Sequence, residues 1–240
     1  MSGGRTRVRG GDGSQGGSPG FLVVLSAPSG AGKNTVLNRV LSRVEGLVYS
    51  VSCTTRPARA GERDGVDYYF LTDEEFDRRV AAGEFLEWAW FCGYRYGTPK
   101  AFVAERVARG ETVIMDIDVQ GSAQVKANWP GAVRVFLLPP SLEELRRRLT
   151  QRGTESRESI EGRLRTAWQE LEAVADYDYV IINDDVERAA QALEAIVRAE
   201  RLKRVRNPWA QWVEILRKGG RIGHGRAIDD GSAQAGGDQG

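Results

Sequence analysis

The sequence predicts an α/β fold in which a parallel sheet lies between layers of helices, and three observations support this class. Four short apolar runs are bounded by glycine or polar residues, as in strands buried on both faces. Patterns typical of amphipathic helices separate these runs, so strands and helices alternate along the chain. The 240 residues, of which 41% are hydrophobic, suffice for the core of one domain. We therefore expect a three-layer sandwich.

The predicted strands and helices alternate in a simple order. The strands are FLVVLSA (21–27), ETVIMDID (111–118), AVRVFLLP (132–139) and YDYVIIND (177–184). The clearest helical segments are NTVLNRVLSRV (34–44), SLEELRRRLTQRG (141–153) and VERAAQALEAIVRAERLKRV (186–205). From Tyr49 to Gly97 the pattern changes to short alternating pieces with glycine and aspartate between them. This change predicts a small β-rich insertion at about residues 50–98.

The two ends of the chain have a different composition. Residues 1–19 and 219–240 are rich in Gly, Ser, Asp and Arg and poor in apolar side chains, so we expect disordered tails. Before the second tail, residues 207–218 carry Trp209, Trp212, Val213 and Leu216 at helical spacing, which predicts an extra amphipathic helix. We expect its apolar stripe to pack back onto the core, and a partner surface is the alternative.

Charge and cysteine content exclude several classes of protein. Lys and Arg (34) and Asp and Glu (33) nearly cancel, so nothing global predicts binding to nucleic acid or a membrane, and any anion site must be local. The two cysteines form no CxxC pair, which argues against a disulfide framework and a zinc site and favours a cytoplasmic protein. We expect neither a signal peptide nor a membrane span, because no run of about 18 apolar residues occurs.

A glycine-rich turn, APSGAGK (27–33), joins the first predicted strand to the first helix. Such a turn lets backbone N–H groups converge on phosphate oxygens, and the helix N-terminus adds positive potential. Gly30 and Gly32 permit close approach of the backbone, and Lys33 can reach the β- and γ-phosphates. The segment therefore predicts a phosphate-binding loop (P-loop). The alternative is a glycine-rich turn with a surface lysine.

Two positions of this loop depart from the usual pattern. Ala27 stands where the first glycine is expected, and Asn34 stands where serine or threonine normally supplies a hydroxyl to the metal. The carbonyl oxygen of an asparagine can bind Mg²⁺ directly or through water, because this ion keeps several waters and needs few protein ligands. The neighbouring Thr35 can help to order the water molecules around the ion.

Further blocks of sequence make the interpretation more specific. Together with the loop, the ordered blocks SVSCTTRPARAGERDGVDYYF, GEFLEWAWFCGYRYGTPK, VIMDIDVQG, RRRLTQRGTESRESIEGRL and VIINDD resemble the guanylate kinase family. The resemblance implies a kinase domain over residues 20–206, in which the insertion binds GMP and a helical lid spans about residues 141–168. The implied reaction is Mg²⁺-dependent transfer of the γ-phosphoryl group of ATP to GMP or dGMP.

The resemblance also implies roles for individual residues. The ATP-binding residues would be Ser29, Gly30, Ala31, Gly32, Lys33, Asn34, Thr35 and Asn183. The GMP-binding residues would be Ser52, Arg56, Arg59, Tyr68, Glu87, Tyr96, Thr98 and Asp118. The catalytic residues would be Lys33, Arg148, Arg152 and Arg163, and the metal would be held by Asn34 and, through water, by Asp116.

The chemistry of these residue types agrees with the implied roles. Guanidinium forks match phosphate geometry, and Glu87 can accept hydrogen bonds from the N1–H and N2–H₂ donors that distinguish guanine from adenine. Each motif also has a plainer interpretation. The arginines of TTRPAR could lie on a solvated loop, Glu87 could be a surface charge, the acids of VIMDID could cap the next segment, and the lid arginines could be a solvated face.

Two rival functions follow from the same residues. A guanylate-kinase-like binding module that has lost catalysis is supported by Asn34, whereas Lys33, Asp116 and the arginines argue against it. A related kinase with another phosphorylated acceptor is disfavoured by Glu87 together with Asp118. We expect no nucleic-acid or membrane partner, and the sequence does not identify a protein partner.

Overall fold

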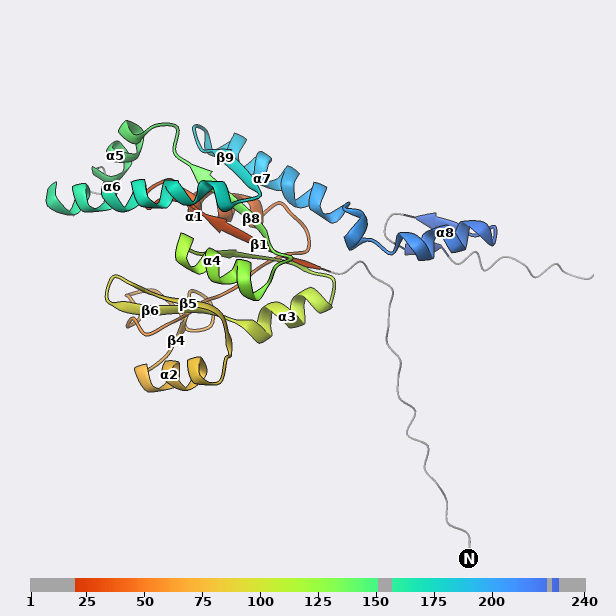
Figure 1. Cartoon of the computed structure of the whole chain (residues 1–240), viewed down its shortest axis with the longest axis horizontal. Coiled ribbons are helices and arrows are strands. Elements are labelled where there is room, and N and C mark those ends of the chain that lie inside the picture. The colour runs from red at the N-terminus through yellow and green to blue at the C-terminus, as the bar shows by residue number, and fades with distance from the viewer. Residues whose placement is uncertain (1–19, 151–156, 224–225, 229–240) are drawn as a thin grey trace, which may run out of the picture.

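The computed structural model describes residues 20–150, 157–223 and 226–228, and a parallel five-stranded sheet forms its centre (Figure 1). The strand order is β2-β7-β1-β8-β9, and every neighbouring pair is parallel. The strands are β1 (Phe21–Ser26), β2 (Leu47–Tyr49), β7 (Thr112–Asp116), β8 (Val133–Leu138) and β9 (Tyr179–Ile182). The predicted α/β class with a parallel sheet is confirmed. Strand β2 was not predicted, because its three residues are too few to show a pattern.

Helices cover both faces of this sheet. The helices are α1 (Lys33–Leu41), α3 (Lys100–Ala108), α4 (Val119–Asn128), α5 (Leu142–Thr150), α6 (Arg157–Glu172) and α7 (Val186–Arg201), and the 3-10 turn η1 (Ala173–Asp176) follows α6. Helices α1 and α7 pack on one face, and α3 and α4 pack on the other. No helix in the described ranges is both long enough and apolar enough to cross a membrane.

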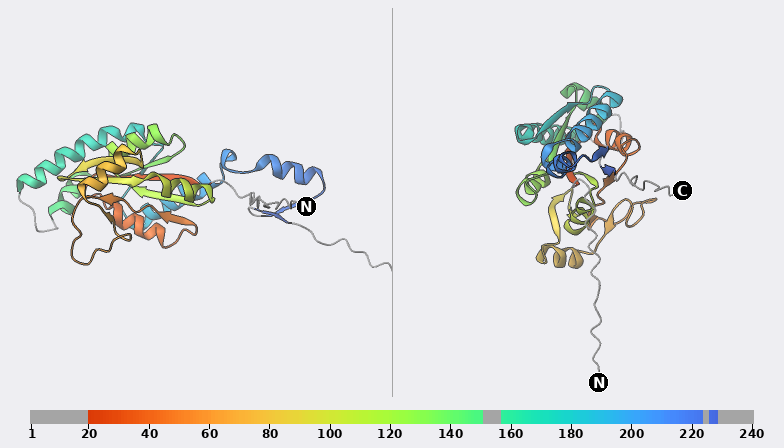
Figure 2. Two further views of the ribbon diagram at one scale, coloured as in Figure 1. Left: turned by 90° about the horizontal axis from the view of Figure 1, so that it is seen from below. Right: turned by 90° about the vertical axis from the view of Figure 1, so that its right-hand side faces the viewer.

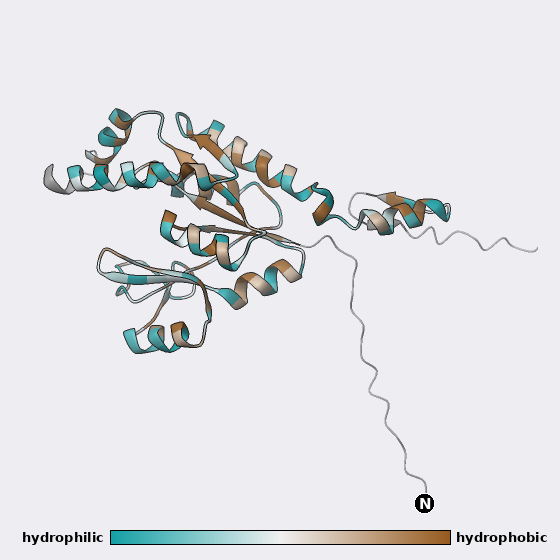
Figure 3. Ribbon diagram, viewed as in Figure 1, coloured by the Kyte–Doolittle hydropathy of each residue, from teal (hydrophilic) through white to brown (hydrophobic). Residues whose placement is uncertain are grey.

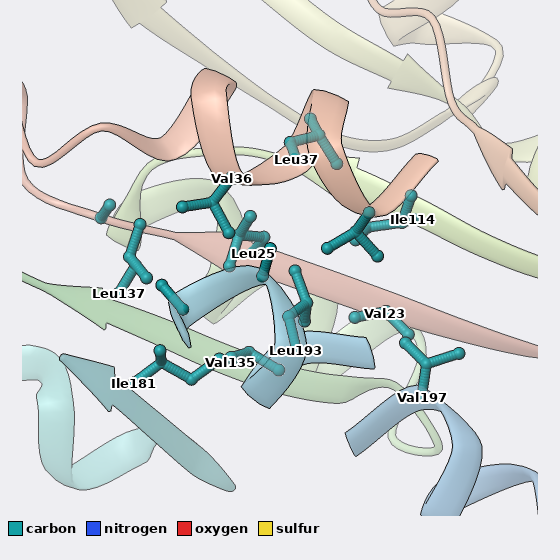
Figure 4. Packing of buried hydrophobic residues seen from close by; sticks show 14 of the residues in the cluster. Val23, Leu25, Val36, Leu37, Ile114, Val135, Leu137, Ile181, Leu193 and Val197 are labelled. Carbon is teal, nitrogen blue, oxygen red and sulfur yellow. The ribbon is translucent and has the colours of Figure 1, made fainter. Parts of the chain in front are cut away.

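The central strand β1 is apolar on both faces because each face has its own core. Val23 and Leu25 point into the cluster beneath α1 and α7, where Val36 and Leu193 are buried (Figure 4). The alternate residue Leu22 points into the cluster beneath α3 and α4. Since side chains alternate along a strand, a strand covered on both sides must be apolar at every position. Figure 3 shows this concentration of hydrophobic residues in the central strands.

A second sheet occupies the region for which a β-rich insertion was expected. Its strand order is β4-β3-β6-β5, and the elements are β3 (Cys53–Thr54), β4 (Tyr69–Phe70), α2 (Asp73–Ala81), β5 (Phe85–Phe91) and β6 (Tyr94–Pro99). Helix α2 was not predicted. It buries Phe76 against Phe85, with ring centroids 4.5 Å apart, beside the buried Cys53. Burial raises the pKa of the Cys53 thiol to about 11, which agrees with a packed rather than a reactive cysteine.

The chain after α7 differs from its prediction in two respects. It continues through η2 (Arg204–Arg206) into α8 (Trp209–Arg217), β10 (Arg221–Gly223) and β11 (Arg226–Ile228). These last elements lie beyond the end of α7 and away from the sheet (Figures 1 and 2). Trp209 and Leu216 are 47% and 53% exposed, so the expectation that the apolar stripe packs onto the core is wrong.

The prediction of a disordered tail from residue 219 is also wrong for β10 and β11. These strands pair antiparallel, so each supplies hydrogen-bond partners that composition alone does not reveal. Strand β10 lies against α8, and a Cβ atom on Gly220 would come within 2.7 Å of the Ile215 side chain. The tails predicted for residues 1–19 and 229–240 lie outside the described residues.

We expect a chain that ends after Asn207 to keep the thermal stability of the full-length protein, because α8 and the hairpin contact each other rather than the sheet. Asn207 is retained because its side chain donates hydrogen bonds to the carbonyl oxygens of Arg201 and Lys203. The melting temperature, followed by circular dichroism, should change by less than about 3 °C. Leu193→Ala is the positive control, since truncating a buried leucine should cost about 2 to 5 kcal/mol. A large drop in the melting temperature of the truncated chain would show that α8 and the hairpin stabilise the sheet.

Candidate active site

The turn between β1 and α1 has the backbone conformation that a phosphate-binding loop needs. Gly30 and Gly32 both have φ of 92°, in the left-handed region that favours glycine. A Cβ atom on Gly32 would lie 2.5 Å from Nδ2 of Asn183, and one on Gly30 would lie 2.7 Å from Cδ2 of Leu149. Both glycines are therefore required by conformation and by the close approach of neighbouring elements.

Two side chains from distant parts of the chain hold this loop in place. Asn183, which follows β9 and is 1% exposed, donates from Nδ2 to the carbonyl oxygen of Ala31 at 2.6 Å. Arg148 of α5 donates to the same oxygen and to the carbonyl oxygen of Asn183, both at 3.1 Å, and its Nε donates to Glu144. The structure thus brings the two predicted residues Asn183 and Arg148 to the loop.

The carboxyl end of β7 places an acid beside the predicted lysine. Nζ of Lys33 lies 3.4 Å from one carboxylate oxygen of Asp116, and the Tyr49 hydroxyl donates to the other at 2.5 Å. Burial and the charge of Asp116 raise the pKa of Tyr49, which therefore stays protonated and keeps donating. Lys33 and Tyr49 thus hold the Asp116 carboxylate at the carboxyl ends of the strands, where the loop also lies.

Asn34 and Thr35 lie on the first turn of α1, and both are exposed. The side-chain oxygens of Asn34 and Asp116 are hard donors of the kind that Mg²⁺ accepts, and the exposure of Asn34 leaves room for water between it and an ion. Among the described residues there is no cluster of three or more His, Cys, Asp or Glu that could hold a metal. The donor set suits an ion that binds few protein groups together with phosphates.

The insertion gathers three of the four residues predicted to bind the GMP phosphate. The guanidinium of Arg56, which is 8% exposed, lies 5.3 Å from the ring centre of Tyr68, and the rings of Tyr68 and Tyr96 lie 5.8 Å apart. Nη2 of Arg56 also donates to Glu62 at 2.9 Å. The side chain of Arg59 is exposed, and its backbone N–H donates to the same glutamate.

Glu87 on β5 is buried rather than a surface charge, with an exposure of 5%. The Thr98 hydroxyl donates to its carboxylate at 2.7 Å, and a Cβ atom on Gly121 would lie 2.7 Å from its other oxygen. Burial, together with the charge of Asp118, raises the pKa of Glu87 to about 7, and the hydrogen bond from Thr98 opposes that rise. The predicted residue Ser52 is half-buried just before β3.

Asp118 caps the helix that follows it, which is the alternative role considered for the acids of VIMDID. Its carboxylate accepts a hydrogen bond at 2.8 Å from the backbone N–H of Gly121 and so caps α4. The carboxylate also acts electrostatically on Glu87, so a capping role and a place near the insertion are both present in one side chain.

The helical pair α5 and α6 lies over the loop, at the position predicted for the lid. Nη2 of Arg163 on α6 lies 2.5 Å from the Ser29 hydroxyl oxygen, so a second predicted lid arginine contacts the loop. Leu145 and Leu149 of α5 pack against Ala167 of α6 in a small core of their own. Arg152, the remaining predicted lid arginine, lies outside the described residues.

Three residues that the sequence prediction missed also belong to this site. Tyr49 holds Asp116 from the edge strand, and Glu62 holds Arg56 from the same loop. Glu170 lies on α6 two turns after Arg163, where a helical-face count from Arg163 would have found it. No local signal pointed to Tyr49, because its partner is on a strand that is distant in sequence.

A glycine turn that opens a helix at the carboxyl ends of parallel strands, with a lysine at the start of that helix, defines the class of P-loop nucleotide-binding proteins. Comparison with known proteins specifies the family. The family model described as guanylate kinase matches residues 20–200. The chain therefore belongs to the guanylate kinase family.

Individual relatives support this membership. The guanylate kinase of Symbiobacterium thermophilum is 50% identical over 200 residues, which cover 83% of this chain and 95% of that protein. The guanylate kinase of Carboxydothermus hydrogenoformans is 50% identical over 184 residues, which cover 77% and 90%. The crystal structure of guanylate kinase from Anaplasma phagocytophilum matches with a TM-score of 0.69 and 38% identity, covering 84% of this chain and 96% of that one.

We expect Gly32→Ala to destabilise the protein by about 2 kcal/mol or more, because it strains a left-handed residue and displaces the Asn183 amide from Ala31. Urea unfolding measures the change. The same variant should bind a non-hydrolysable ATP analogue more weakly in a fluorescence titration. Gly131→Ala is the matched control, since a Cβ atom there meets nothing within 4 Å. Equal behaviour of the two variants would contradict the role given to the Gly32 turn.

Proposed function

We propose that this chain is an ATP:GMP phosphotransferase, which transfers the γ-phosphoryl group of ATP to GMP and releases ADP and GDP. The observation that carries the proposal is that a chain of the guanylate kinase family holds a glycine turn beside a lysine and, in its insertion, a buried arginine with two tyrosines and a buried glutamate. We infer that the loop around Lys33 binds the ATP phosphates and that the insertion, in which Arg56 and Glu87 are each buried, binds GMP. The curated relatives are themselves named guanylate kinase.

The reaction makes limited demands on acid–base chemistry. An oxygen of the GMP phosphate forms a bond to the γ-phosphorus of ATP, and the bond from that phosphorus to the bridging oxygen of ADP breaks. Because the attacking oxygen already carries negative charge, no strong general base is needed. The protein must bring two polyanions together, hold them in line and offset the charge on the transferred group.

On the donor side, the backbone N–H groups of the loop and Lys33 would hold the ATP phosphates, and Asn183 would lie near the base and ribose. The lid arginines Arg148, Arg152 and Arg163 would supply positive charge to the transferred group. The contacts of Arg148 and Arg163 with the loop support this proposal, since both guanidinium groups are already at its surface. A phosphate oxygen is a stronger acceptor than the carbonyl and hydroxyl oxygens that these groups contact.

On the acceptor side, Arg56, Arg59, Tyr68 and Tyr96 would bind the GMP phosphate. The clustering of Arg56 with the two tyrosines supports this role. Glu62 keeps the guanidinium of Arg56 oriented, and the entering phosphate would compete for its N–H groups. A charge that is already paired avoids the cost of an isolated buried charge.

The guanine base would be recognised by Glu87, with Thr98, Ser52 and Asp118 around it. An ionised carboxylate accepts the N1–H and N2–H₂ donors of guanine, whereas adenine presents no such pair of donors to it. The hydrogen bond from Thr98 leaves the second carboxylate oxygen of Glu87 for one of these donors. This arrangement favours GMP over AMP as the acceptor.

Mg²⁺ fits the residues at the end of β7 and the start of α1. Asn34 and, through water, Asp116 would hold the ion, which would neutralise phosphate charge when bound with ATP. Lys33, paired with Asp116 at 3.4 Å, would turn to the phosphates. Because ATP and GMP are cytoplasmic nucleotides, we expect the protein to act in the cytoplasm.

A coupled assay of ADP release with GMP, dGMP, AMP, UMP and CMP as acceptors tests the proposed function. Turnover should be fastest with GMP, and AMP should react at a small fraction of that rate. An inactive binding module would bind GMP in a calorimetric titration yet form no GMP-dependent ADP at any Mg²⁺ concentration. That result would overturn the proposal.

We expect Glu87→Gln to raise the KM for GMP by about 10-fold or more, since a lost charge-assisted hydrogen bond costs about 1.5 to 3 kcal/mol. The KM for ATP should change little. In the parent protein, the KM for GMP should rise as the pH falls through 7, because the Glu87 carboxyl has a pKa of about 7 and is neutral at lower pH. The variant should lose this dependence.

The control for this prediction is Glu74→Gln, which changes an exposed glutamate on the insertion helix α2. Its KM for GMP and its pH profile should match the parent. A parent KM for GMP that stays constant between pH 6 and 8, in the range around the Glu87 pKa of about 7, would remove Glu87 from base recognition.

We expect Asn34 to be compatible with turnover but to weaken metal binding, because its longer side chain reaches the ion through water. Asn34→Ser should lower the Mg²⁺ concentration for half-maximal activity by about 2- to 5-fold, since a single altered ligand contact is worth about 1 kcal/mol or less. Calorimetric titration of Mg²⁺ into the complex with ADP should show tighter Mg²⁺ binding to Asn34→Ser than to the parent. Asn38→Ser, one turn later on the exposed face of α1, is the control. If the parent is inactive and Asn34→Ser is active, the loop of the parent has lost its catalytic function and the prediction is wrong.

A further inference from the structure

Four aromatic rings form a row across the sheet of the insertion. The ring centroids of Phe70 on β4 and of Tyr68, two residues earlier, lie 6.0 Å apart, and those of Tyr68 and Tyr96 on β6 lie 5.8 Å apart. Phe91, the last residue of β5, completes the row, because its ring centroid lies 6.2 Å from that of Tyr96 with the ring planes at 73°. The two phenylalanines are thus the ends of the row, and the two tyrosines predicted to bind the GMP phosphate lie between them.

The row lies on the face of the insertion sheet that carries Glu87, opposite the face that packs against α2. Tyr69 packs into the small core beneath α2, so its neighbours Tyr68 and Phe70 point to the other face. Phe91 follows Glu87 by four residues along β5 and therefore points to the same side as Glu87. The row is not part of the core that holds the insertion together, and it borders the surface where the base would bind.

Phe91 supports the Tyr96 ring from a side that the strand pairing leaves open. Ala89 is paired directly opposite Tyr96, and its methyl group is too small to fill the space beside a ring. Phe91 is the diagonal neighbour on the same face, a position from which an aromatic side chain reaches across an antiparallel pair. Because Phe91 is 51% exposed, its ring can be removed without opening a cavity in a core.

We propose that Phe91 is a positioning residue for the GMP phosphate, which holds the Tyr96 ring from the β5 side while Tyr68 holds it from the other side. The inference rests on the proposed function, in which these two tyrosines bind that phosphate. A phenyl ring offers no hydrogen bond to a phosphate oxygen, so Phe91 acts through Tyr96.

Contacts on both sides of the Tyr96 ring give its hydroxyl one direction. Edge-to-face ring pairs such as those with Tyr68 and Phe91 are favourable and depend on orientation. The same row holds the neighbouring cation, since the guanidinium of Arg56 lies 5.3 Å from the ring centre of Tyr68 and 5.9 Å from that of Phe70. Groups that are already oriented lose less conformational freedom when a ligand binds. Loss of the Phe91 ring therefore weakens binding of the phosphate and leaves recognition of the base unchanged.

The test compares binding of GMP with binding of guanosine, which lacks the phosphate, by competition against a fluorescent GMP analogue. Phe91→Ala should raise the Kd for GMP about 3- to 10-fold, as expected for the loss of one edge-to-face pair, and the Kd for guanosine less than about 2-fold. Phe91→Tyr, which keeps the ring, should stay within about 2-fold of the parent for both ligands.

Trp90→Ala is the matched control, because Trp90 is 60% exposed and points to the opposite face of β5. The ring of Trp90 contacts Arg95, which keeps its ion pairs with Asp73 and Asp77 in this variant. Both Kd values of this control should match those of the parent. A control that loses GMP affinity as Phe91→Ala does would show a general effect of the hairpin and overturn the inference.

A double-variant cycle shows whether Phe91 acts through the Tyr96 hydroxyl. Tyr96→Phe removes the hydroxyl and keeps the ring, so in this background Phe91→Ala should change the Kd for GMP less than about 2-fold. Equal losses in both backgrounds, equal losses for GMP and guanosine, or an unchanged GMP affinity in Phe91→Ala would each overturn the inference. These titrations contain no ATP, so a parent that binds GMP but forms no ADP would refute the proposed function alone. A parent that does not bind GMP would overturn both.

Discussion

The carbonyl oxygen of Ala31 is the point on which the site depends. It accepts hydrogen bonds from Asn183, beyond the last strand of the sheet, and from Arg148 in the lid. The close approach of Asn183 is possible only because residue 32 is glycine. A single backbone oxygen thus joins the loop, the sheet and the lid, and it explains why a turn of otherwise flexible residues keeps one conformation. The buried amide also leaves its own Oδ1 without a partner among the described residues, a cost that a structural role alone does not explain.

Three cations of the site share a second property, which is that the side chain of each already has a partner within the protein. Lys33 is beside Asp116, Arg56 is paired with Glu62, and Arg163 contacts the Ser29 hydroxyl. Such pairing avoids isolated charges and holds long side chains in one orientation, so less ordering remains to be done when phosphates arrive. The same pairing lowers the affinity for weak anions, because an anion must displace these partners before it can interact fully with the cations. Phosphates meet that requirement, since they offer several charged oxygens to each fork.

Sequence reasoning succeeded where the signal is local or repeated along the chain. The strands around Leu25 and Val135 are long apolar runs, and the loop at Gly30 and Gly32 has a fixed spacing, so both could be predicted from the residues alone. It did not find the contact of Tyr49 with Asp116, because strand neighbours are set by topology rather than by distance in sequence. It misjudged the helix around Trp209, because an apolar stripe indicates that a face is amphipathic but not what covers it. Burial of Glu87 and Glu170 likewise depends on elements that pack from elsewhere in the chain.

The strand order has a consequence for how the protein is made. Strand β1 is synthesised first among the described elements, yet its neighbours β7 and β8 begin only at Thr112 and Val133. Asn183 emerges later still. By contrast, the strands of the insertion are close together in sequence and enclose their own small core, so this part can collapse while the ribosome is still adding the central sheet. The nascent chain therefore carries an unsupported glycine loop for most of its synthesis, and nucleotide can act as a ligand that favours folding only after Asn183, about three quarters of the way along the 240 residues, has left the ribosome.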